Sequence, residues 1–172
     1  MNTASEKQVR LLIDMNSIVN QAMLGGTDHE NGIVLTHPET GKDVKINSAL
    51  YTVDRFLERY KQALEHFDIA PVDVVAVWDG KGGKAYRQMF LPQYKAGRDK
   101  LPEQHEVLNE AKESINTLLR FLGTTVVQQD ACEADDTLAY LAKHLSSTSN
   151  IIYTGDGELT VLVSGETHVW RQ

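Results

Sequence analysis

Short apolar segments that each lead to an aspartate are the strongest structural signal in this chain. Three of them, with the aspartates that follow, are residues 9–13 with Asp14, residues 72–78 with Asp79, and residues 151–154 with Asp156. Continuous apolar, β-branched runs of this length are typical of strands buried on both faces of a parallel sheet. Helical patterns separate the segments, and parallel strands joined by helices form right-handed crossovers. The sequence therefore predicts an α/β fold with a central, mostly parallel sheet.

Amphipathic helices are predicted between these strands. One is indicated by apolar residues at intervals of three and four, namely Leu50, Val53, Leu57, Tyr60, Leu64 and Phe67. A second begins at Pro102, ends before Gly123, and has a core face made of Leu108, Ala111, Ile115, Leu118 and Leu122. A third spans residues 133–145. The shorter predicted elements are a helical segment at 16–23, a hairpin that pairs 33–35 with 44–46, and strands at 124–128 and 168–170.

The composition fits a single domain of 172 residues, because about 150 residues per domain is usual. Cys132 is the only cysteine, which excludes an intrachain disulfide. No apolar run approaches the roughly 18 residues of a membrane span, and the first ten residues lack the apolar centre of a signal peptide. We therefore expect a cytoplasmic protein, in the host cytoplasm if phage-encoded, with no membrane partner. The net charge of −7 argues against a nucleic-acid partner held by bulk positive charge.

Seven carboxylates are predicted to meet at one edge of the sheet. Asp14, Asp79 and Asp156 follow strands, and the carboxyl ends of parallel strands form the ligand crevice of such folds. The other four are Glu158, just beyond Asp156, and Glu133, Asp135 and Asp136 at the start of the third helix. Clustered carboxylates repel one another unless cations join them, and an all-oxygen donor set favours Mg²⁺ or Mn²⁺ over zinc. Two such ions are the usual apparatus of phosphodiester hydrolysis.

A purely structural alternative exists for the three acids that begin the helix. The helix dipole stabilises acidic side chains in a first turn by about 0.3–1 kcal/mol, without any functional role. An aspartate after a strand can likewise be only a turn or a helix cap. The convergence of four acidic motifs on one edge favours the metal-site interpretation.

A basic stretch follows Asp79. Between residues 81 and 100 it carries six cations against the single acid Asp99, and these cations are Lys81, Lys84, Arg87, Lys95, Arg98 and Lys100. The aromatic residues Tyr86, Phe90 and Tyr94 are interleaved with them, a combination that suits a channel for single-stranded nucleic acid. The alternative is a solvated surface loop, with Phe90 and Leu91 as core anchors of a short helix. Met89 is predicted to lie in the core.

Nearly the whole chain carries an ordered set of motifs: Leu-Leu-Ile-Asp14-Met-Asn16, Val-Trp-Asp79-Gly, Tyr94-Lys95-Ala-Gly-Arg98, Glu133-Ala-Asp135-Asp136 and Thr154-Gly-Asp156-Gly-Glu158. In this order they resemble the 5′-nuclease superfamily. That superfamily contains flap endonucleases, phage-type 5′→3′ exonucleases and the 5′-nuclease domain of bacterial DNA polymerase I. The resemblance implies one PIN-like domain over residues 1–172, with three layers, a helical arch at about 81–102 and an acidic cleft for two Mg²⁺ ions, for which Mn²⁺ substitutes.

The resemblance also implies roles for individual residues. The ligands grouped around the first ion are Asp14, Asp79, Glu133 and Asp135, and those at or near the second are Asp136, Asp156 and Glu158. Lys95 and Arg98 match the basic pair that contacts the scissile phosphate. Arg87 and Tyr94 match neighbours that guide or stack the single strand, and we expect Lys81, Lys84, Tyr86 and Lys100 to contribute to the same nucleic-acid surface.

Two features depart from the family pattern. The family usually has aspartate at the position of Glu158, so this longer side chain is expected to reach its ion differently or through water. Family members also continue with a helical module that grips the duplex, and the 172 residues do not include one. A separate C-terminal helical subunit or domain is therefore an expected partner.

The leading hypothesis is a metal-dependent nuclease that hydrolyses DNA, and RNA in hybrids, from 5′ ends or 5′ flaps. Two alternatives stay open. One is a non-catalytic or partial homologue that binds DNA or a partner protein, and the other is an RNA-cleaving PIN-domain toxin, a group without the basic arch. The seven predicted ligands together carry a charge of −7, which equals the net charge of the chain. The acidity therefore fits a metal site better than a surface that repels DNA.

Overall fold

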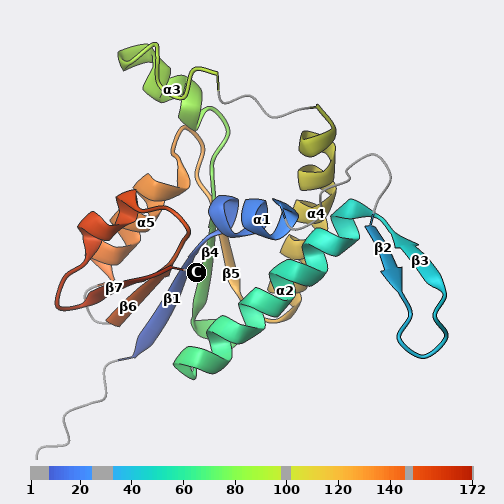
Figure 1. The fold of residues 1–172 in the computed structure, drawn as a ribbon. Coiled ribbons are helices and arrows are strands. Elements are labelled where there is room, and N and C mark those ends of the chain that lie inside the picture. Colours follow the sequence, from blue (N-terminus) through green and yellow to red (C-terminus); the bar gives the residue numbers. More distant parts are fainter. Residues whose placement is uncertain (1–7, 25–32, 98–101, 146–148, 172) are drawn as a thin grey trace, which may run out of the picture.

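The structure is a computed structural model that describes residues 8–24, 33–97, 102–145 and 149–171 (Figure 1). Its main sheet has five strands: β1 (Val9–Asp14), β4 (Val74–Trp78), β5 (Thr125–Gln128), β6 (Ser149–Tyr153) and β7 (Thr167–Trp170). The helices are α1 (Met15–Leu24), α2 (Ser48–Phe67), α3 (Gly83–Phe90), α4 (Pro102–Phe121) and α5 (Ala134–His144). The remaining described elements are the short helices η1 (Pro71–Asp73) and η2 (Glu158–Leu162), and a hairpin of β2 (Ile33–Thr36) and β3 (Asp43–Ile46).

The main sheet is parallel throughout and has the order β5-β4-β1-β6-β7. The chain runs from β1 through β4 to β5, and then crosses to β6 and β7 on the other side of β1. Such a reversal opens a crevice at the carboxyl ends of the strands beside the central one. Asp14, the last residue of β1, stands at that point. The predicted α/β fold is confirmed.

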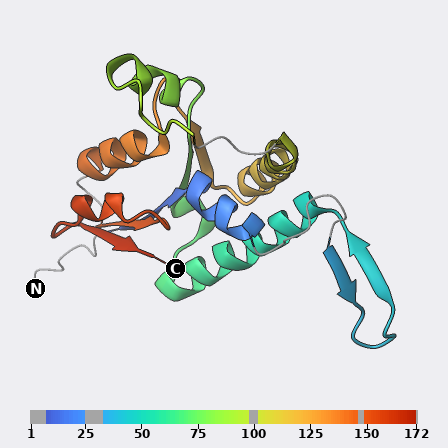
Figure 2. The same cartoon turned by 45° about the horizontal axis from the view of Figure 1, so that its top comes forward.

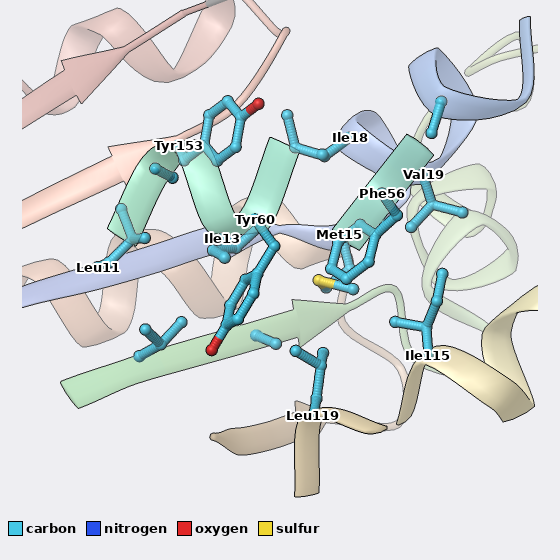
Figure 3. Close-up of a cluster of buried hydrophobic side chains, with 14 of the residues drawn as sticks. Leu11, Ile13, Met15, Ile18, Val19, Phe56, Tyr60, Ile115, Leu119 and Tyr153 are labelled. Carbon is cyan, nitrogen blue, oxygen red and sulfur yellow. The ribbon is translucent and has the colours of Figure 1, made fainter. Parts of the chain in front are cut away.

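Helices cover both faces of the sheet, and each face has its own hydrophobic core (Figure 2). On one face α1, α2 and α4 pack over alternate strand residues such as Leu11 and Ile13, and Phe56 of α2 lies among them (Figure 3). On the other face α5 and η2 pack over Leu12 and Ile152. Successive side chains of a strand point to opposite faces, so burial on both sides explains the continuous apolar runs.

Helix α4 packs against the core with Leu108, Ala111 and Ile115 as predicted, but its C-terminal part differs from the prediction. Ala111, Ile115 and Leu119 are fully buried, whereas Leu118 is 37% exposed and Leu122 is 43% exposed. Leu118 and Leu119 are neighbours in the sequence, so helical periodicity alone allowed either of them to point inward. The packing of α4 against α2 and the sheet selects Leu119. The prediction that Leu118 and Leu122 lie in the core was wrong.

The other predicted elements are present, with boundaries that differ by one or two residues. Strand β4 begins at Val74, two residues later than predicted, because Pro71 starts the short helix η1. Helix α4 is followed by Gly123, whose φ of 89° places it in the left-handed region expected of a residue just past a helix end. The hairpin is antiparallel and projects away from the main sheet (Figure 1). No helix in the described ranges is long and apolar enough to cross a membrane.

Candidate metal centre and gateway

Asp14 is a buried carboxylate at the carboxyl edge of the sheet. Its side chain is held by two donors from different elements: the Ser17 backbone N–H donates to Oδ1 at 3.1 Å, and the Thr154 hydroxyl donates to Oδ2 at 2.8 Å. Thr154 directly follows β6, so this contact joins the ends of β1 and β6. The residue is only 4% exposed. Burial raises the pKa of Asp14, and the neighbouring charges of Asp79 and Asp156 act in the same direction.

Asp79 connects the end of β4 to the start of α5. Its Oδ1 accepts a hydrogen bond from the Ala134 backbone N–H at 2.7 Å, and its own N–H donates to Asn16 Oδ1 at 2.9 Å. The next residue, Gly80, passes directly against the backbone of Gln129, where a Cβ atom would lie 1.6 Å from the carbonyl oxygen. A side chain at Gly80 would therefore push β4 and its aspartate away from α5.

Three further carboxylates form a group that we call the carboxylate triad: Asp135, Asp156 and Glu158. Each offers an oxygen atom, and these atoms all lie within 4.8 Å of one another. The turn after β6 is fixed by the backbone N–H of Asp156, which donates to Thr154 Oγ1, and by that of Glu158, which donates to Asp156 Oδ1, each at 2.9 Å. The triad lines a cavity of about 380 Å³ together with Tyr94 and Lys95.

Asp135 carries the electrostatic cost of this arrangement. Burial raises its pKa to about 6, and repulsion from Asp14, Asp156 and Asp79 adds to the effect, while Lys95 opposes it. Four carboxylates from four separate segments therefore lie close enough to perturb one another. This mutual repulsion is what a bound divalent cation would relieve.

A second group faces Glu133, and we call it the gateway cluster: Arg87, Tyr94, Lys95, Glu133 and Asp136. Glu133 Oε2 accepts hydrogen bonds from the Tyr94 hydroxyl at 2.7 Å and from Lys95 Nζ at 2.9 Å, and it lies 3.2 Å from the Arg87 guanidinium. The same guanidinium donates to Asp136 Oδ1 at 2.8 Å and to the Tyr94 hydroxyl at 2.7 Å. Asp136 Oδ2 accepts from the Glu133 backbone N–H, which caps α5.

The gateway cluster keeps its two cations charged. Burial would lower the pKa of Lys95, but its hydrogen bonds and charge interactions with Glu133 and Tyr94 together outweigh burial, and the pKa rises. Burial also opposes the charge on Arg87, yet its bond to Asp136 and its proximity to Glu133 raise the pKa above its ordinary value. Glu133 has only 4% of its side chain exposed, and its negative charge is thus balanced by Lys95 and Arg87.

The other residues predicted to bind nucleic acid lie around this cluster or outside it. Lys84 lines a cavity of about 410 Å³ beside Asp79 and Glu133. Lys81 is exposed in the turn before α3, and Tyr86 stacks edge-on against Phe90 with ring centroids 5.4 Å apart. Arg98 and Lys100 lie outside the described residues.

Helix α3 is not anchored in the core by its apolar residues. Met89 is 77% exposed and Phe90 is 74% exposed, while Leu91 is 47% exposed. The prediction that Met89 lies in the core was wrong, and so was the alternative that Phe90 and Leu91 anchor the helix. Figure 1 shows the reason, because α3 stands beyond the carboxyl edge of the sheet, away from both cores.

The structure brings the predicted carboxylates to one edge but divides their environment. Asp14, Asp79 and the carboxylate triad influence one another electrostatically or lie within contact distance, whereas Glu133 and Asp136 face the gateway cations. The carboxylate pattern did not predict the residues that position the ligands, above all Asn16, which binds the backbone of Asp79, and Thr154, which binds the carboxylate of Asp14. Each lies two residues from a predicted ligand, which was the available signal.

The donor set fits a hard divalent ion. Every predicted ligand supplies carboxylate oxygen, which suits Mg²⁺, Mn²⁺ or Ca²⁺. The triad has the spacing of a group that could hold one ion, and Lys95 only partly offsets the burial and repulsion that raise the pKa of Asp135. Fold and site together define a class of protein: a parallel α/β domain with an acidic cleft at the carboxyl edge of its sheet and a basic helical element beside it.

Comparison with known families places the chain within this class. The family described as "5′-3′ exonuclease, N-terminal resolvase-like domain" matches residues 10–172, and the chain belongs to that family. The resemblance inferred from the motifs is therefore confirmed.

Curated relatives match about half of the chain. A 5′-3′ exonuclease of Mycoplasma pneumoniae is 37% identical over 89 residues, which are 49% of this chain and 29% of the relative. A DNA polymerase I of Pseudomonas aeruginosa is 31% identical over 91 residues, 52% of this chain and 10% of the polymerase. The matched segments are thus a minor part of each relative.

Solved structures share the fold at low sequence identity. The T5 5′-exonuclease with bound divalent metal ions (zinc) superimposes with a TM-score of 0.65 at 12% identity, over 95% of this chain and 55% of that enzyme. A bacteriophage T5 flap endonuclease variant in a pseudo-enzyme-product complex with DNA and metal ions gives a TM-score of 0.63, also at 12% identity, with the same coverage. This chain therefore spans about half the length of these enzymes.

Proposed function

We propose that this chain is the catalytic part of a divalent-metal-dependent nuclease that hydrolyses DNA at 5′ ends or 5′ flaps. The observation that carries the proposal is the convergence of carboxylates from the ends of β1, β4 and β6 and the start of α5, beside two cations that stay charged. Membership of the 5′-3′ exonuclease family and the likeness in fold to phage enzymes support it.

Two Mg²⁺ ions, or Mn²⁺ in their place, are part of this proposal. The carboxylate triad would hold one ion. Asp14, Asp79 and Glu133 would hold the other, and the Asp135 carboxylate would contribute to both sites. When bound, such ions lower the pKa of a coordinated water and stabilise charge on phosphate oxygens. Asp136 acts differently in this scheme, because its carboxylate holds the Arg87 guanidinium in position.

The gateway cations would act on the substrate phosphate. Lys95 has a raised pKa and remains protonated at neutral pH, so it is suited to neutralise charge that develops on phosphoryl oxygens and not to accept a proton. Arg87 presents a planar guanidinium whose fork geometry matches a phosphate. The Tyr94 hydroxyl bridges Arg87 and Glu133, and thereby fixes the spacing between the cation and the carboxylate.

The exposed face of α3 suits an unpaired strand. Tyr86 and Phe90 are exposed and lie on the helix that carries Arg87. Aromatic rings stack on bases of any sequence, by about 1–3 kcal/mol per base, while basic residues follow the backbone. A single strand that crosses α3 would therefore lead its phosphates toward the acidic edge.

A 5′-labelled flap substrate tests the proposal. With Mg²⁺ or Mn²⁺, the chain is expected to release labelled product, and Asp135→Ala is expected to abolish release because the triad loses a ligand. Asp54→Asn, which removes an exposed carboxylate on α2, is the matched control and should leave cleavage unchanged. Calorimetry of metal binding on the same three proteins gives a readout independent of cleavage.

The outcomes separate the proposal from its alternative. A chain that binds flap DNA tightly but leaves it intact with either metal would be a non-catalytic DNA-binding module. Full cleavage by Asp135→Ala would contradict the metal assignment and leave the nuclease proposal in need of other ligands.

A further inference from the structure

A pocket with a mixed polar and apolar lining lies behind the candidate metal centre, on the face of the sheet that α1 and α4 cover. It has a volume of about 200 Å³, and its polar lining comes from Asn16, Asn20, Trp78, His105, Asn109 and Lys112. None of the described residues that line it is a carboxylate, although the chain as a whole carries a charge of −7. A cavity with one ammonium, an imidazole and several amides is suited to an anion.

Lys112 is the charged centre of this pocket. Its ammonium lies 4.5 Å from the centroid of the Trp78 ring, a cation–π contact. Within the described part of the chain, no carboxylate forms an ion pair with it. Burial lowers the pKa of Lys112, and the more distant charge of Asp79 only partly opposes this. A half-buried cation without an anionic partner is what an arriving phosphate would stabilise.

Two contacts fix the geometry of the pocket. The Trp78 indole N–H donates to Asn116 Oδ1 at 2.8 Å, which holds the ring against Lys112. Asn16 must accept through Oδ1, because its partner is the backbone N–H of Asp79. Its carboxamide oxygen is therefore engaged by Asp79, which leaves the NH₂ group as the side chain's donor.

The pocket is coupled to the acidic edge through neighbouring residues. Trp78 precedes Asp79 directly, and Asn16 both lines the pocket and bonds to Asp79 at 2.9 Å. The gateway cluster lies on the α3 and α5 side of Asp79, so the pocket and the gateway flank the same aspartate. A strand that passes over the edge would meet both.

We propose that this pocket binds a phosphate of the DNA strand next to the scissile one, with Lys112 as its cation and Asn16 as a neutral donor. The inference rests on the proposed nuclease function and names a contact for that substrate on the opposite side of Asp79 from the gateway. Lys112 is a positioning residue here, because it would hold the strand without touching the reacting atoms.

Lys112→Gln tests the contact, with Lys112→Arg as the charge-preserving variant and Lys143→Gln as a control for an exposed lysine near the far end of α5. Affinity for flap DNA is measured across a salt series with Ca²⁺ as the metal, and a gel confirms that the strand stays intact. Lys112→Gln is expected to weaken binding about 10-fold and to lower the slope of log affinity against log salt by about 1. Lys112→Arg and Lys143→Gln should keep the wild-type slope.

Single methylphosphonate linkages locate the phosphate. In wild type, one neutral linkage beside the scissile one should weaken binding about as much as Lys112→Gln does, and the same linkage should cost the variant nothing further. A wild-type affinity and salt slope in Lys112→Gln would overturn the pocket and leave the nuclease proposal standing. Flap DNA that wild type itself fails to bind would overturn both, and the far-UV spectrum of each variant guards against loss of fold.

Discussion

The two halves of the acidic edge solve the same electrostatic problem in opposite ways. In the gateway cluster, Glu133 is almost fully buried, and Lys95, Arg87 and Tyr94 all direct a donor toward one of its oxygens. In the carboxylate triad, none of the described residues donates to Asp135 in this way, and burial with repulsion raises its pKa to about 6 although Lys95 opposes the rise. Both groups begin from the same turn of α5, only two residues apart.

The difference shows where an external cation is needed. The buried Glu133 has its counter-charges within the chain, whereas a bound divalent cation would relieve the repulsion among three carboxylates that lie within 4.8 Å of one another. The gateway cluster supplies its own counter-charges, even though Glu133 is also proposed as a ligand of the other ion, whereas Lys95 only partly offsets the repulsion that acts on Asp135 in the triad. The seven predicted carboxylate ligands therefore differ in role: some pair with cations of the chain itself, and others are available to an added metal ion.

The largest expected effect compares one acid from each half in the flap-cleavage assay. Asp156→Asn should reduce kcat by about 1,000-fold, because a lost metal ligand removes several kcal/mol of transition-state stabilisation. Asp136→Asn should reduce it by only about 10-fold to 100-fold, since this residue acts through Arg87. Equal losses in the two variants would mean that Asp136 is a ligand and that the division into halves is wrong.

Mg²⁺ should stabilise the folded chain through the triad. At a concentration 100 times its Kd, the ion is expected to raise the free energy of unfolding by about 2.7 kcal/mol, as measured by urea titration. Asp156→Asn should lose most of this gain, while Asp54→Asn should retain it. The gain should also shrink toward pH 5, where protons compete for Asp135. A metal effect of equal size in Asp156→Asn would contradict the triad as the binding site.

Sequence patterns were sufficient for the sheet and for the carboxylates that follow its strands. Parallel strands bring their carboxyl ends to one edge, so the sequence alone predicts that Asp14, Asp79 and Asp156 lie together. The division between gateway and triad could not be seen in this way. It depends on which carboxylate oxygen Lys95 reaches on a residue 38 positions further along the chain, and no periodicity encodes such a contact.

Apolar residues outside the sheet were harder to assign for a related reason. Leu118 and Leu119 satisfy the same helical pattern, and only the position of α2 decides which of them is buried. Met89 is an apolar residue of a type that usually lies in a core, but it belongs to α3, which stands away from both hydrophobic cores. Local patterns predict that an element exists, whereas the partner that it packs against is a property of the whole fold.

Glu133→Gln should destabilise the metal-free protein by about 2 kcal/mol at pH 7. The substitution removes the negative charge that Lys95 and Arg87 share, and removing one partner of a buried ion pair is costly. The estimate is below the usual range for buried pairs because the two cations are 31% and 29% exposed. Asp54→Asn, at an exposed pair on α2, should change stability by less than about 0.5 kcal/mol. Urea unfolding in EDTA measures both, and similar values would show that the gateway cluster contributes nothing to the fold.

Asp135→Asn is expected to act in the opposite direction, and its effect is the smallest. The folded pKa of Asp135, about 6, lies above the unfolded value near 3.8, so the folded state binds the proton more tightly. The resulting stability is fully present below about pH 4 and is lost as the pH rises to about 6, which leaves the charged carboxylate destabilising at pH 7. Neutralising it should therefore raise the free energy of unfolding in EDTA by about 1 kcal/mol, after allowance for partial solvent exposure.

The substitution should also flatten the decline in the free energy of unfolding between pH 4 and pH 6, although Asp14, whose pKa is also raised, will preserve part of the slope. A variant that is less stable than wild type at pH 7 would mean that Asp135 is already neutralised within the folded chain, as Glu133 is, and the contrast between the two halves would fail.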